Sequence, residues 1–248
     1  MFHILLLRLT APMQSWGVMS RFSRRDTGKE PSKSGVIGLL CAALGISRDE
    51  ANTENPLFAE LLQLKMGVLA LREGVLQSDY HTAQNIIKAD GKLPPKGDTK
   101  LSTRFYLADA DFVVALEGEN RETLEKIQAA LTNPKWQLFL GRKAFAPAAP
   151  VRFREGVITT EKSLEDFLRS RELKEILDKY DDEFGAKRFD IARQTRLIIE
   201  SDAGSETRQD VPLSFSARRF TNRRVKTEFV ELDNGGETNG NLSDENDA

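Results

Sequence analysis

Basic side chains interleaved with aromatic ones are the residues of this sequence that could do chemistry. The long segment between Leu7 and Gly35 leaves an apolar run and ends where a helix is expected to begin. Connections of this length are usually functional or disordered, and a disordered linker has no need of Trp16 and Phe22. Free backbone N–H groups and the helix dipole favour a phosphate at such a helix start. The segment carries Arg21, Arg24, Arg25, Lys29 and Lys33.

Three further basic groups follow along the chain. Arginine can bind a phosphate through two hydrogen bonds and can also stack on a base. Trp16, Phe22 and Tyr80 could stack on unpaired bases, which is how single-stranded RNA is usually held. Each group alone is more often a solvated surface, but together they predict a site for single-stranded nucleic acid. The groups are Gly141, Arg142 and Lys143; Arg218, Arg219, Arg223 and Arg224; and Lys88, Lys92, Lys96 and Lys100.

Several classes of enzyme lack their signatures here. The chain has two histidines and one cysteine, without H-E-x-x-H or C-x-x-C spacing, so we expect no transition-metal site. It has no P-loop, no G-x-G-x-x-G after a strand and no G-x-S-x-G, so nucleotide-dependent chemistry and a hydrolase nucleophile lack support. We interpret His3 as a residue of the first strand and Cys41 as a small buried hydrophobe. We therefore expect neither a cofactor nor a metal.

The net charge of −2 is the sum of two unlike parts. The last eighteen residues carry six acidic and no Lys or Arg side chains, so residues 1–230 hold 36 basic against 32 acidic residues, a charge of +4. We expect residues 232–248 to form a disordered acidic tail. The sequence shows no membrane-spanning run and no signal peptide, so we expect a cytoplasmic protein.

The elements that must position these residues predict an α+β protein. Phe2–Leu9 is a nearly continuous apolar run, typical of a central strand. Ser32–Ile46 is predicted to be a helix, capped by Ser32 or Ser34 and ended at Gly45. Next we expect two strands around a turn at Arg72–Gly74. A strand near 105–118 and a helix capped by Asn120 come after them. This order is close to the split βαβ, ferredoxin-like (RRM-like) fold.

We expect three parts, with a soft boundary near Pro150. The first is a ferredoxin-like RNA-binding domain at 1–150. The second is a smaller β-rich region with one helix at 151–231, and the third is the tail. The stretch Ala83–Arg104 is rich in Lys, Gly and Pro and has little core character, which predicts a protruding hairpin or flexible arm within the first part.

Five stretches carry a resemblance. They are "LRLTAPMQSWG", "RDTGKEPSKSGVIGLLCAALGISRDE", "DYHT" before the basic arm, "FLGRK" and "RRFTNR". Together they resemble the CRISPR-associated Cas-five family, in the subtype I-E branch that forms part of the Cascade surveillance complex. The resemblance covers Met1 to about Leu232, without the sequence of the arm or the acidic tail.

The resemblance implies a non-catalytic subunit that caps the crRNA by gripping its 5′ handle. Its implied protein partners are the CasC backbone subunit and the large CasA subunit, with target DNA met only through the complex. It also implies a β-hairpin thumb, which maps to Gln84–Thr103, at the junction of handle and spacer.

Site residues follow from the resemblance position by position. Trp16 could instead pack the loop down, Gly141 could only shape a turn, and Tyr80 and His81 could anchor the base of the thumb. The implied RNA-binding residues are Gln14, Trp16, Arg21, Arg24, Arg25, Thr27, Lys33, Ser34, Tyr80, His81, Gly141, Arg142, Lys143 and Arg219.

Two other functions stay open at this point. The first is a metal-independent endoribonuclease that processes pre-crRNA, as a subtype I-C relative does with Tyr, Lys and His. Tyr80 and His81 are adjacent and lysines are nearby, but neighbours in a strand point to opposite faces. The second is a protein-only scaffold, which predicts no salt-sensitive RNA affinity.

Overall fold

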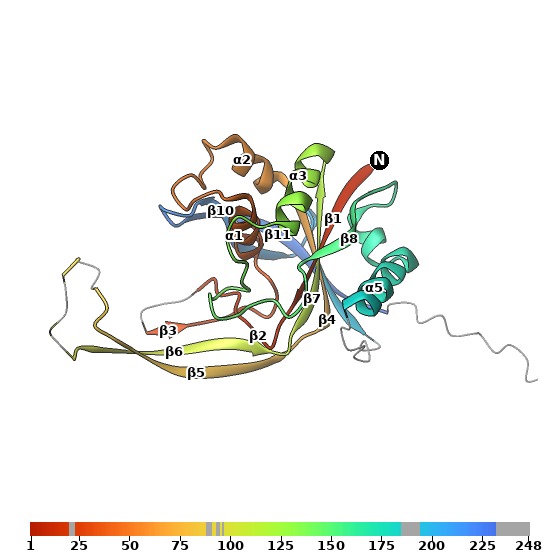
Figure 1. The fold of residues 1–248 in the computed structure, drawn as a ribbon. Helices are drawn as coiled ribbons and strands as arrows, with labels where there is room; N and C mark the ends of the chain where they lie inside the picture. The colour runs from red at the N-terminus through yellow and green to blue at the C-terminus, as the bar shows by residue number, and fades with distance from the viewer. Residues whose placement is uncertain (20–22, 88–90, 93–94, 96, 185–193, 232–248) are drawn as a thin grey trace, which may run out of the picture.

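The protein is described from a computed structural model that covers residues 1–19, 23–87, 91–92, 95, 97–184 and 194–231. Within these residues, a large sheet carries helices on both faces, and a smaller sheet extends away from it as a long hairpin (Figure 1). The mixed α+β class is as predicted. The proposed tail at 232–248 lies outside the described residues, and no described helix is long and apolar enough to cross a membrane.

The large sheet has seven strands, and all its neighbours pair antiparallel. Their spatial order is β10-β11-β9-β4-β7-β1-β8. Helices cover both faces of its centre, which explains why β1 reads as an unbroken apolar run rather than an alternating one. The strands are β1 (Phe2–Thr10), β4 (Lys65–Arg72), β7 (Asp111–Gly118), β8 (Arg152–Thr160), β9 (Thr195–Glu200), β10 (Glu206–Ser214) and β11 (Arg219–Val230).

Two apolar cores lie on opposite sides of this sheet. Leu5 and Leu7 of β1 face the first core, and Ile4 and Leu6 face the second. Burying each such side chain contributes about 1.5–3 kcal/mol, so both helical layers are firmly held. The first core is covered by α1 (Lys33–Leu44), α2 (Pro56–Gln63) and α3 (Arg121–Thr132), and the second by α4 (Leu164–Leu168) and α5 (Arg171–Phe184).

Helix α1 begins and ends where its sequence signals place the caps. The Ser32 hydroxyl accepts a hydrogen bond from the Gly35 N–H at 3.2 Å, so Ser32 rather than Ser34 is the N-cap. Gly45 ends the helix with a φ of +78°, the left-handed conformation that glycine adopts readily. The start of α1 is thereby fixed against the loop that precedes it.

The boundary expected near Pro150 does not separate two sheets. β8 pairs with β1, and β9 pairs with β4, so strands from both predicted regions share one hydrogen-bonded ladder. The described strands of the large sheet that precede Pro150 are β1, β4 and β7. They leave two open edges, and β8 and β9 cover both of them. The described residues of 151–231 include the two helices α4 and α5, where one helix was expected.

The smaller sheet forms a hairpin with two short strands along its side. β5 (Val75–Gln84) and β6 (Thr99–Ala108) pair from Val75↔Ala108 to Gln84↔Thr99. The arm expected over 84–103 falls within this hairpin, although 88–90, 93–94 and 96 lie outside the described residues. On the other side of β6, β2 (Met13–Gln14) pairs antiparallel and β3 (Arg24–Arg25) pairs parallel.

The strand expected near 105–118 is in fact two strands. β6 ends at Ala108 and β7 begins at Asp111, because Asp109 has a φ of +56° and turns the chain from the hairpin into the large sheet. This turn is why the hairpin leaves the body at an angle (Figure 1).

Candidate nucleic-acid interface

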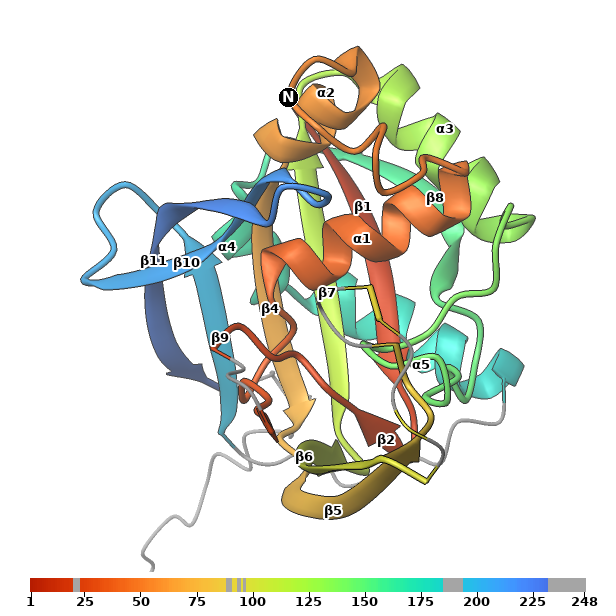
Figure 2. The same ribbon diagram turned by 90° about the vertical axis from the view of Figure 1, so that its left-hand side faces the viewer.

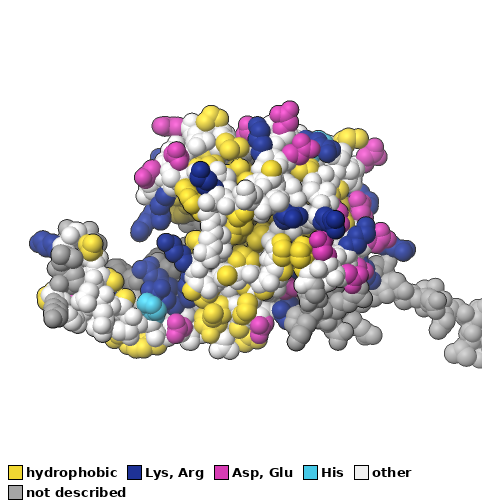
Figure 3. Space-filling view, in the orientation of Figure 1, with side chains coloured by type: hydrophobic (Ala, Val, Ile, Leu, Met, Phe, Trp, Pro, Cys, Tyr) yellow, Lys and Arg dark blue, Asp and Glu magenta, His cyan; other side chains and the backbone are white. Residues whose placement is uncertain are grey.

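A cleft with a volume of about 490 Å³ lies where the long first loop, the start of α1, β6 and the turn after Leu140 meet. We call it the arginine cleft. Among the described residues that line it, Asp26 is the only acid, against four arginines. Figure 3 shows Lys and Arg side chains gathered where the hairpin leaves the body. The lining consists of Ser15, Trp16, Gly17, Arg25, Asp26, Ser32, Ser34, Gly35, Arg48, Arg104, Gly141, Arg142, Phe215 and Phe220.

Strand pairing brings two of the arginines together. Arg25 of β3 lies in register with Arg104 of β6, although the two are far apart in the sequence. Arg24 does not line the cleft itself, and its guanidinium carbon lies over the Phe105 ring, 4.5 Å from the ring centre. A stacked guanidinium keeps its hydrogen-bonding edge available for a phosphate. The first loop and the hairpin thus build one basic surface.

The turn after Leu140 brings in Arg142. Its Nη2 donates to the Phe105 carbonyl oxygen at 2.6 Å, and its guanidinium carbon lies 5.2 Å from the centre of the Phe145 ring. Burial, and then the nearby Arg104, lower the pKa of Arg142 from its ordinary value. Both causes destabilise the charged form of Arg142, and a bound phosphate would stabilise it.

Gly141 shapes this turn. Its φ is +95°, and a Cβ at this position would lie 1.8 Å from the Ser15 carbonyl oxygen. Only glycine fits both the conformation and the close approach to the first loop. Gly141 therefore shapes the turn, which the sequence analysis named as the alternative to RNA contact. Gly141 also lines the cleft.

Three of the expected RNA contacts lie inside the protein. Gln14 is fully buried; its Nε2 donates to the carbonyl oxygens of Leu9 and Ala110, and its Oε1 accepts from Trp16 Nε1. Trp16 is 2% exposed, so it packs the loop down instead of offering a face for stacking. A buried amide and indole that satisfy each other stabilise the loop and are not available to a ligand.

Lys33 is the third expected RNA contact that lies inside the protein. Its side chain is 2% exposed, and its Nζ lies 3.0 Å from both carboxylate oxygens of Glu200. Burial lowers the pKa of Lys33, and the Glu200 carboxylate opposes that shift. Its backbone N–H donates to Asp210 Oδ2 at 2.7 Å. The start of α1 therefore already holds a carboxylate, which has taken the place that the sequence offered to a phosphate.

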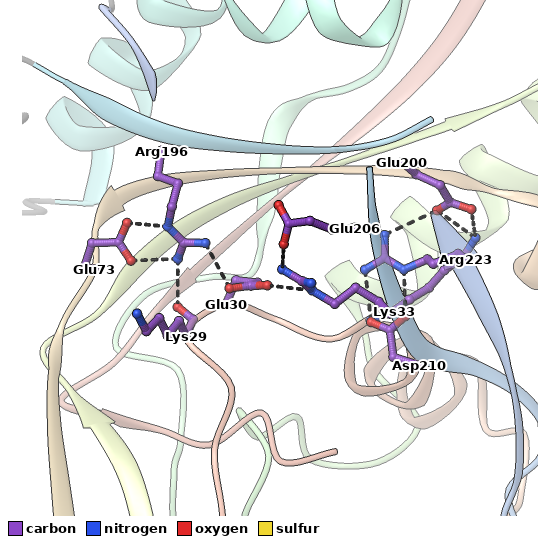
Figure 4. Close-up of polar contacts among 10 residues, drawn as sticks. Lys29, Glu30, Lys33, Glu73, Arg196, Glu200, Glu206, Asp210 and Arg223 are labelled. Carbon is purple, nitrogen blue, oxygen red and sulfur yellow. Dashed lines mark hydrogen bonds and ion pairs between the residues drawn. The ribbon is translucent and has the colours of Figure 1, made fainter. Parts of the chain in front are cut away.

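Carboxylates and arginines of the last three strands fasten the first loop to the sheet (Figure 4). Arg196 of β9 donates to Glu30 at 2.9 Å, to the Lys29 carbonyl oxygen at 3.2 Å and to both oxygens of Glu73. Arg208 of β10 also reaches Glu30, at 3.3 Å. The loop before α1 and the turn before β5 are thus held by the same guanidinium.

A second group of ion pairs lies beside the first (Figure 4). Arg223 of β11 donates to both oxygens of Asp210, at 2.7 and 3.0 Å, and approaches Glu200 at 3.5 Å. Both carboxylates also bind Lys33. Arg223 was one of the basic residues that pointed to nucleic acid, but it is buried and fully engaged here.

The other expected site residues lie around the cleft. Thr27 accepts from the Trp16 N–H, so it supports the loop. Ser34 lines the cleft, whereas Lys143 lines the groove beside it and Arg219 is exposed at the start of β11. Arg21 lies outside the described residues.

Tyr80 and His81 lie on β5 of the hairpin and do not line the cleft. Tyr80 is 67% exposed, whereas His81 is partly buried, in keeping with side chains on opposite faces of a strand. The pair therefore does not converge on one reacting atom. Among the residues that the structure describes, no three His, Cys, Asp or Glu side chains form a group that could hold a metal ion.

Nine residues that line the cleft were not among the predicted contacts, and four of them have an arginine or phenylalanine side chain. Arg48 and Arg104 come from the segment after α1 and from β6, and Phe215 and Phe220 come from the two sides of the β10–β11 turn. Phe220 lies inside "RRFTNR", a stretch from which only arginines were predicted to bind nucleic acid. Arg48 is isolated among acidic neighbours, and only the folded chain shows where it lies.

The fold and the cleft define a class: mixed α+β proteins with mostly antiparallel sheets and an arginine-lined cleft beside an extended hairpin. The chain belongs to the CRISPR-associated protein (Cas_Cas5) family, whose sequence pattern it matches over residues 4–226. The resemblance read from the five stretches is thereby confirmed.

Individual relatives agree with this assignment. The chain is 35% identical over 153 residues to the CRISPR system Cascade subunit CasD of Escherichia coli (strain K12); the match covers 56% of this chain and 65% of that protein. A crystal structure of a Cas protein has a TM-score of 0.65 and 34% identity, over 92% of this chain and 95% of that one. A CRISPR RNA-guided surveillance complex contains a chain with a TM-score of 0.69 and 31% identity, over 92% and 90%.

Proposed function

We propose that this protein is the crRNA-binding subunit of a Cascade-type CRISPR surveillance complex, and that it holds the 5′ handle of the crRNA in the arginine cleft. The observation that carries the proposal is the charge of the cleft, four arginines against one aspartate among its described lining residues. The likeness to CasD and to a chain of an RNA-guided surveillance complex supports the assignment. Arginine is suited to phosphate and to stacked bases at once.

The geometry suggests a revised set of handle contacts. Arg25, Arg104 and Arg142 face the cleft, and Arg24 lies beside it on the same strand. Arg48 and Ser34 extend the set toward α1. We propose these six as direct contacts, with Gln14, Trp16, Thr27, Lys33 and Gly141 as the residues that shape the cleft.

The topology supports a finer description of the fold. The elements β1, α1, β4, β7, α3 and β8 follow the order β-α-β-β-α-β, and their strands lie in the spatial order β4-β7-β1-β8. We propose that this is the ferredoxin-like (RRM-like) unit. The β5–β6 hairpin is inserted between its second and third strands, and we propose it as the thumb.

We propose a non-catalytic role, with CasC and CasA subunits as the protein partners. The separation of Tyr80 from His81 across β5 argues against their joint use in RNA cleavage. The cytoplasmic location stays a prediction.

Binding across a salt series tests the proposal. The full chain is titrated with RNA copied from the CRISPR repeat, in EDTA, and the affinity is measured at increasing salt. We expect the affinity to fall steeply with salt, and the double variant Arg25→Ala/Arg142→Ala to bind more weakly with a slope smaller by about 0.7 for each lost phosphate contact. Arg171→Ala on α5, also an exposed arginine, is the matched control and should leave the slope unchanged.

Either of two results would overturn the proposal. Salt-independent binding would favour a protein-only scaffold. A discrete metal-free cut in the RNA, seen on a denaturing gel and lost in His81→Ala, would identify a processing nuclease.

A further inference from the structure

An apolar groove continues directly from the arginine cleft. It has a volume of about 740 Å³ and runs along α1. We call it the α1 groove; its lining includes Gly38, Ala42, Trp136, Phe139 and Phe215. It shares Ser34, Gly35, Arg48, Gly141 and Phe215 with the arginine cleft. A strand whose phosphates lie in the cleft therefore has its next nucleotides at the mouth of the groove.

Two aromatic residues flank α1, and hydrogen bonds of their main-chain groups hold both in place. The Trp136 N–H donates to the Ala42 carbonyl oxygen of α1 at 3.1 Å. On the other flank, the Phe215 N–H donates to the Ala51 carbonyl oxygen at 3.1 Å, and Arg48 Nε donates to the Phe215 carbonyl oxygen at 3.1 Å. Figure 2 shows α1 lying between the segment after α3 and the β10–β11 turn. The walls are thus in place before a ligand arrives.

The lining combines stacking surfaces with a few polar groups. Trp136 is 45% exposed although it lies in a groove, and Phe139 and Phe215 add further apolar surface. Gln137 can donate and accept hydrogen bonds at a base edge, and Lys143 supplies a cation at the rim. Aromatic faces with a side-chain amide are what proteins use to hold unstacked bases.

We propose that the α1 groove binds an unpaired base of the RNA whose phosphates occupy the arginine cleft. This inference rests on the proposed function and adds to it a site that reads bases. The cleft supplies charge, which cannot distinguish one sequence from another, whereas the groove supplies the contacts that can.

Gly38 offers a sharp test because it lies on the floor of the groove. A Cβ at Gly38 would meet only the Phe215 ring, at 3.7 Å, which is an ordinary contact. Gly38→Ala therefore fits, and it should raise the stability of the helix because alanine is the better helix former. Gly38→Leu fills more of the groove, and the melting temperature shows whether it folds. Gly35→Ala is no substitute, because its Cβ would lie 2.9 Å from Trp16 Cε3.

The experiment uses the full chain and a short RNA copied from the CRISPR repeat, with a series of RNAs that each lack one base. In the wild type, we expect loss of one particular base to weaken binding about tenfold, as for a stacked base. In Gly38→Leu, the complete RNA should bind about tenfold more weakly, and loss of that same base should have no further effect. Trp136 fluorescence should be quenched by the complete RNA and not by the RNA that lacks that base.

Other outcomes would overturn the inference. If every RNA of the series binds like the complete one, or if Gly38→Leu and Gly38→Ala both bind RNA normally, the groove holds no base. If these variants instead lose binding to another protein subunit, the groove holds a protein side chain. In each case, a normal salt slope that depends on Arg25 and Arg142 would leave the proposed function standing, and its absence would remove both proposals.

Discussion

Basic residues of the first loop and of the helix after it serve two different purposes. Arg25 is exposed in the cleft, whereas Lys33, eight positions later, is buried against Glu200 and Asp210. A row of basic residues in a sequence cannot separate the two purposes, because their partners come from β9 and β10, more than 160 residues further along. Of the predicted RNA contacts, Arg25 and Arg142 line the cleft, whereas Gln14, Trp16 and Lys33 are buried. As RNA contacts, all of them stay predictions.

This difference predicts that two lysine substitutions change the free energy of unfolding by unequal amounts. Lys33→Ala leaves the Glu200 carboxylate partly buried with one cation fewer, so we expect the free energy of unfolding to fall by about 3 kcal/mol. Lys143→Ala removes an exposed charge at the rim of the α1 groove and should change it by less than about 0.5 kcal/mol. Urea unfolding of both variants measures this. Equal midpoints would contradict the internal role of Lys33.

Burial also predicts how Cys41 reacts. Its side chain lies in the first core, and burial raises the pKa of its thiol to about 12. Only the thiolate is nucleophilic, so we expect a thiol reagent such as DTNB to modify the folded protein very slowly between pH 7 and 9. The same reagent in urea should react at the rate of a free thiol and serves as the control. Fast modification of the native chain would show that α1 opens.

The first loop, which lines part of the arginine cleft, is held in place by elements from distant parts of the chain. The first loop, β2 and β3 have few hydrogen bonds of their own, and they gain their position from β6, from the turn after Leu140 and from Arg196 and Arg208. The sequence predicted α1 and α3 from their caps and a protruding hairpin or flexible arm from its composition, but it did not predict α2. It could not predict that β6 carries partners on both sides, because β2 and β3 are two residues long and have no periodicity.

Arg196 is expected to couple the loop to the hairpin. Arg196→Ala removes the hydrogen bonds to Glu30, Glu73 and the Lys29 carbonyl oxygen together, so amides near 26–30 and 72–76 should exchange faster with deuterium. We expect the free energy of unfolding to fall by about 2 kcal/mol and RNA affinity to fall as well.

Two comparisons sharpen this prediction. Arg196→Lys keeps the charge but not the forked geometry, so it should restore the effect only in part. Arg171→Ala, an exposed arginine of α5, should leave exchange near 26–30 unchanged. Normal exchange in Arg196→Ala would show that β3 pairing alone holds the loop.

At the scale of the whole molecule, the later part of the chain completes the earlier part. β8 and β9 cover both edges of the three earlier strands β4, β7 and β1, α4 and α5 cover the second core, and Asp210 and Glu200 bind the start of α1. The proline-rich bend before Val151 suggested a boundary. Local sequence signals indicate a bend, but they do not show which edge of a sheet a later strand joins. A single sequence gives little information about which distant strands pair with each other.

This dependence predicts that residues 1–150 do not fold alone. Without β9, the edge of β4 is open, and without α4 and α5, Leu6, Leu69 and Val113 face water. We expect a chain ended after Pro150 to aggregate and to show no cooperative melting by circular dichroism. A chain ended after Glu231, which lacks only the acidic segment, is the matched control and should keep the melting temperature of the full chain. A monomeric, cooperatively melting 1–150 chain would instead establish the two-part division, and the cleft would then have to be stable without Arg196 and Asp210.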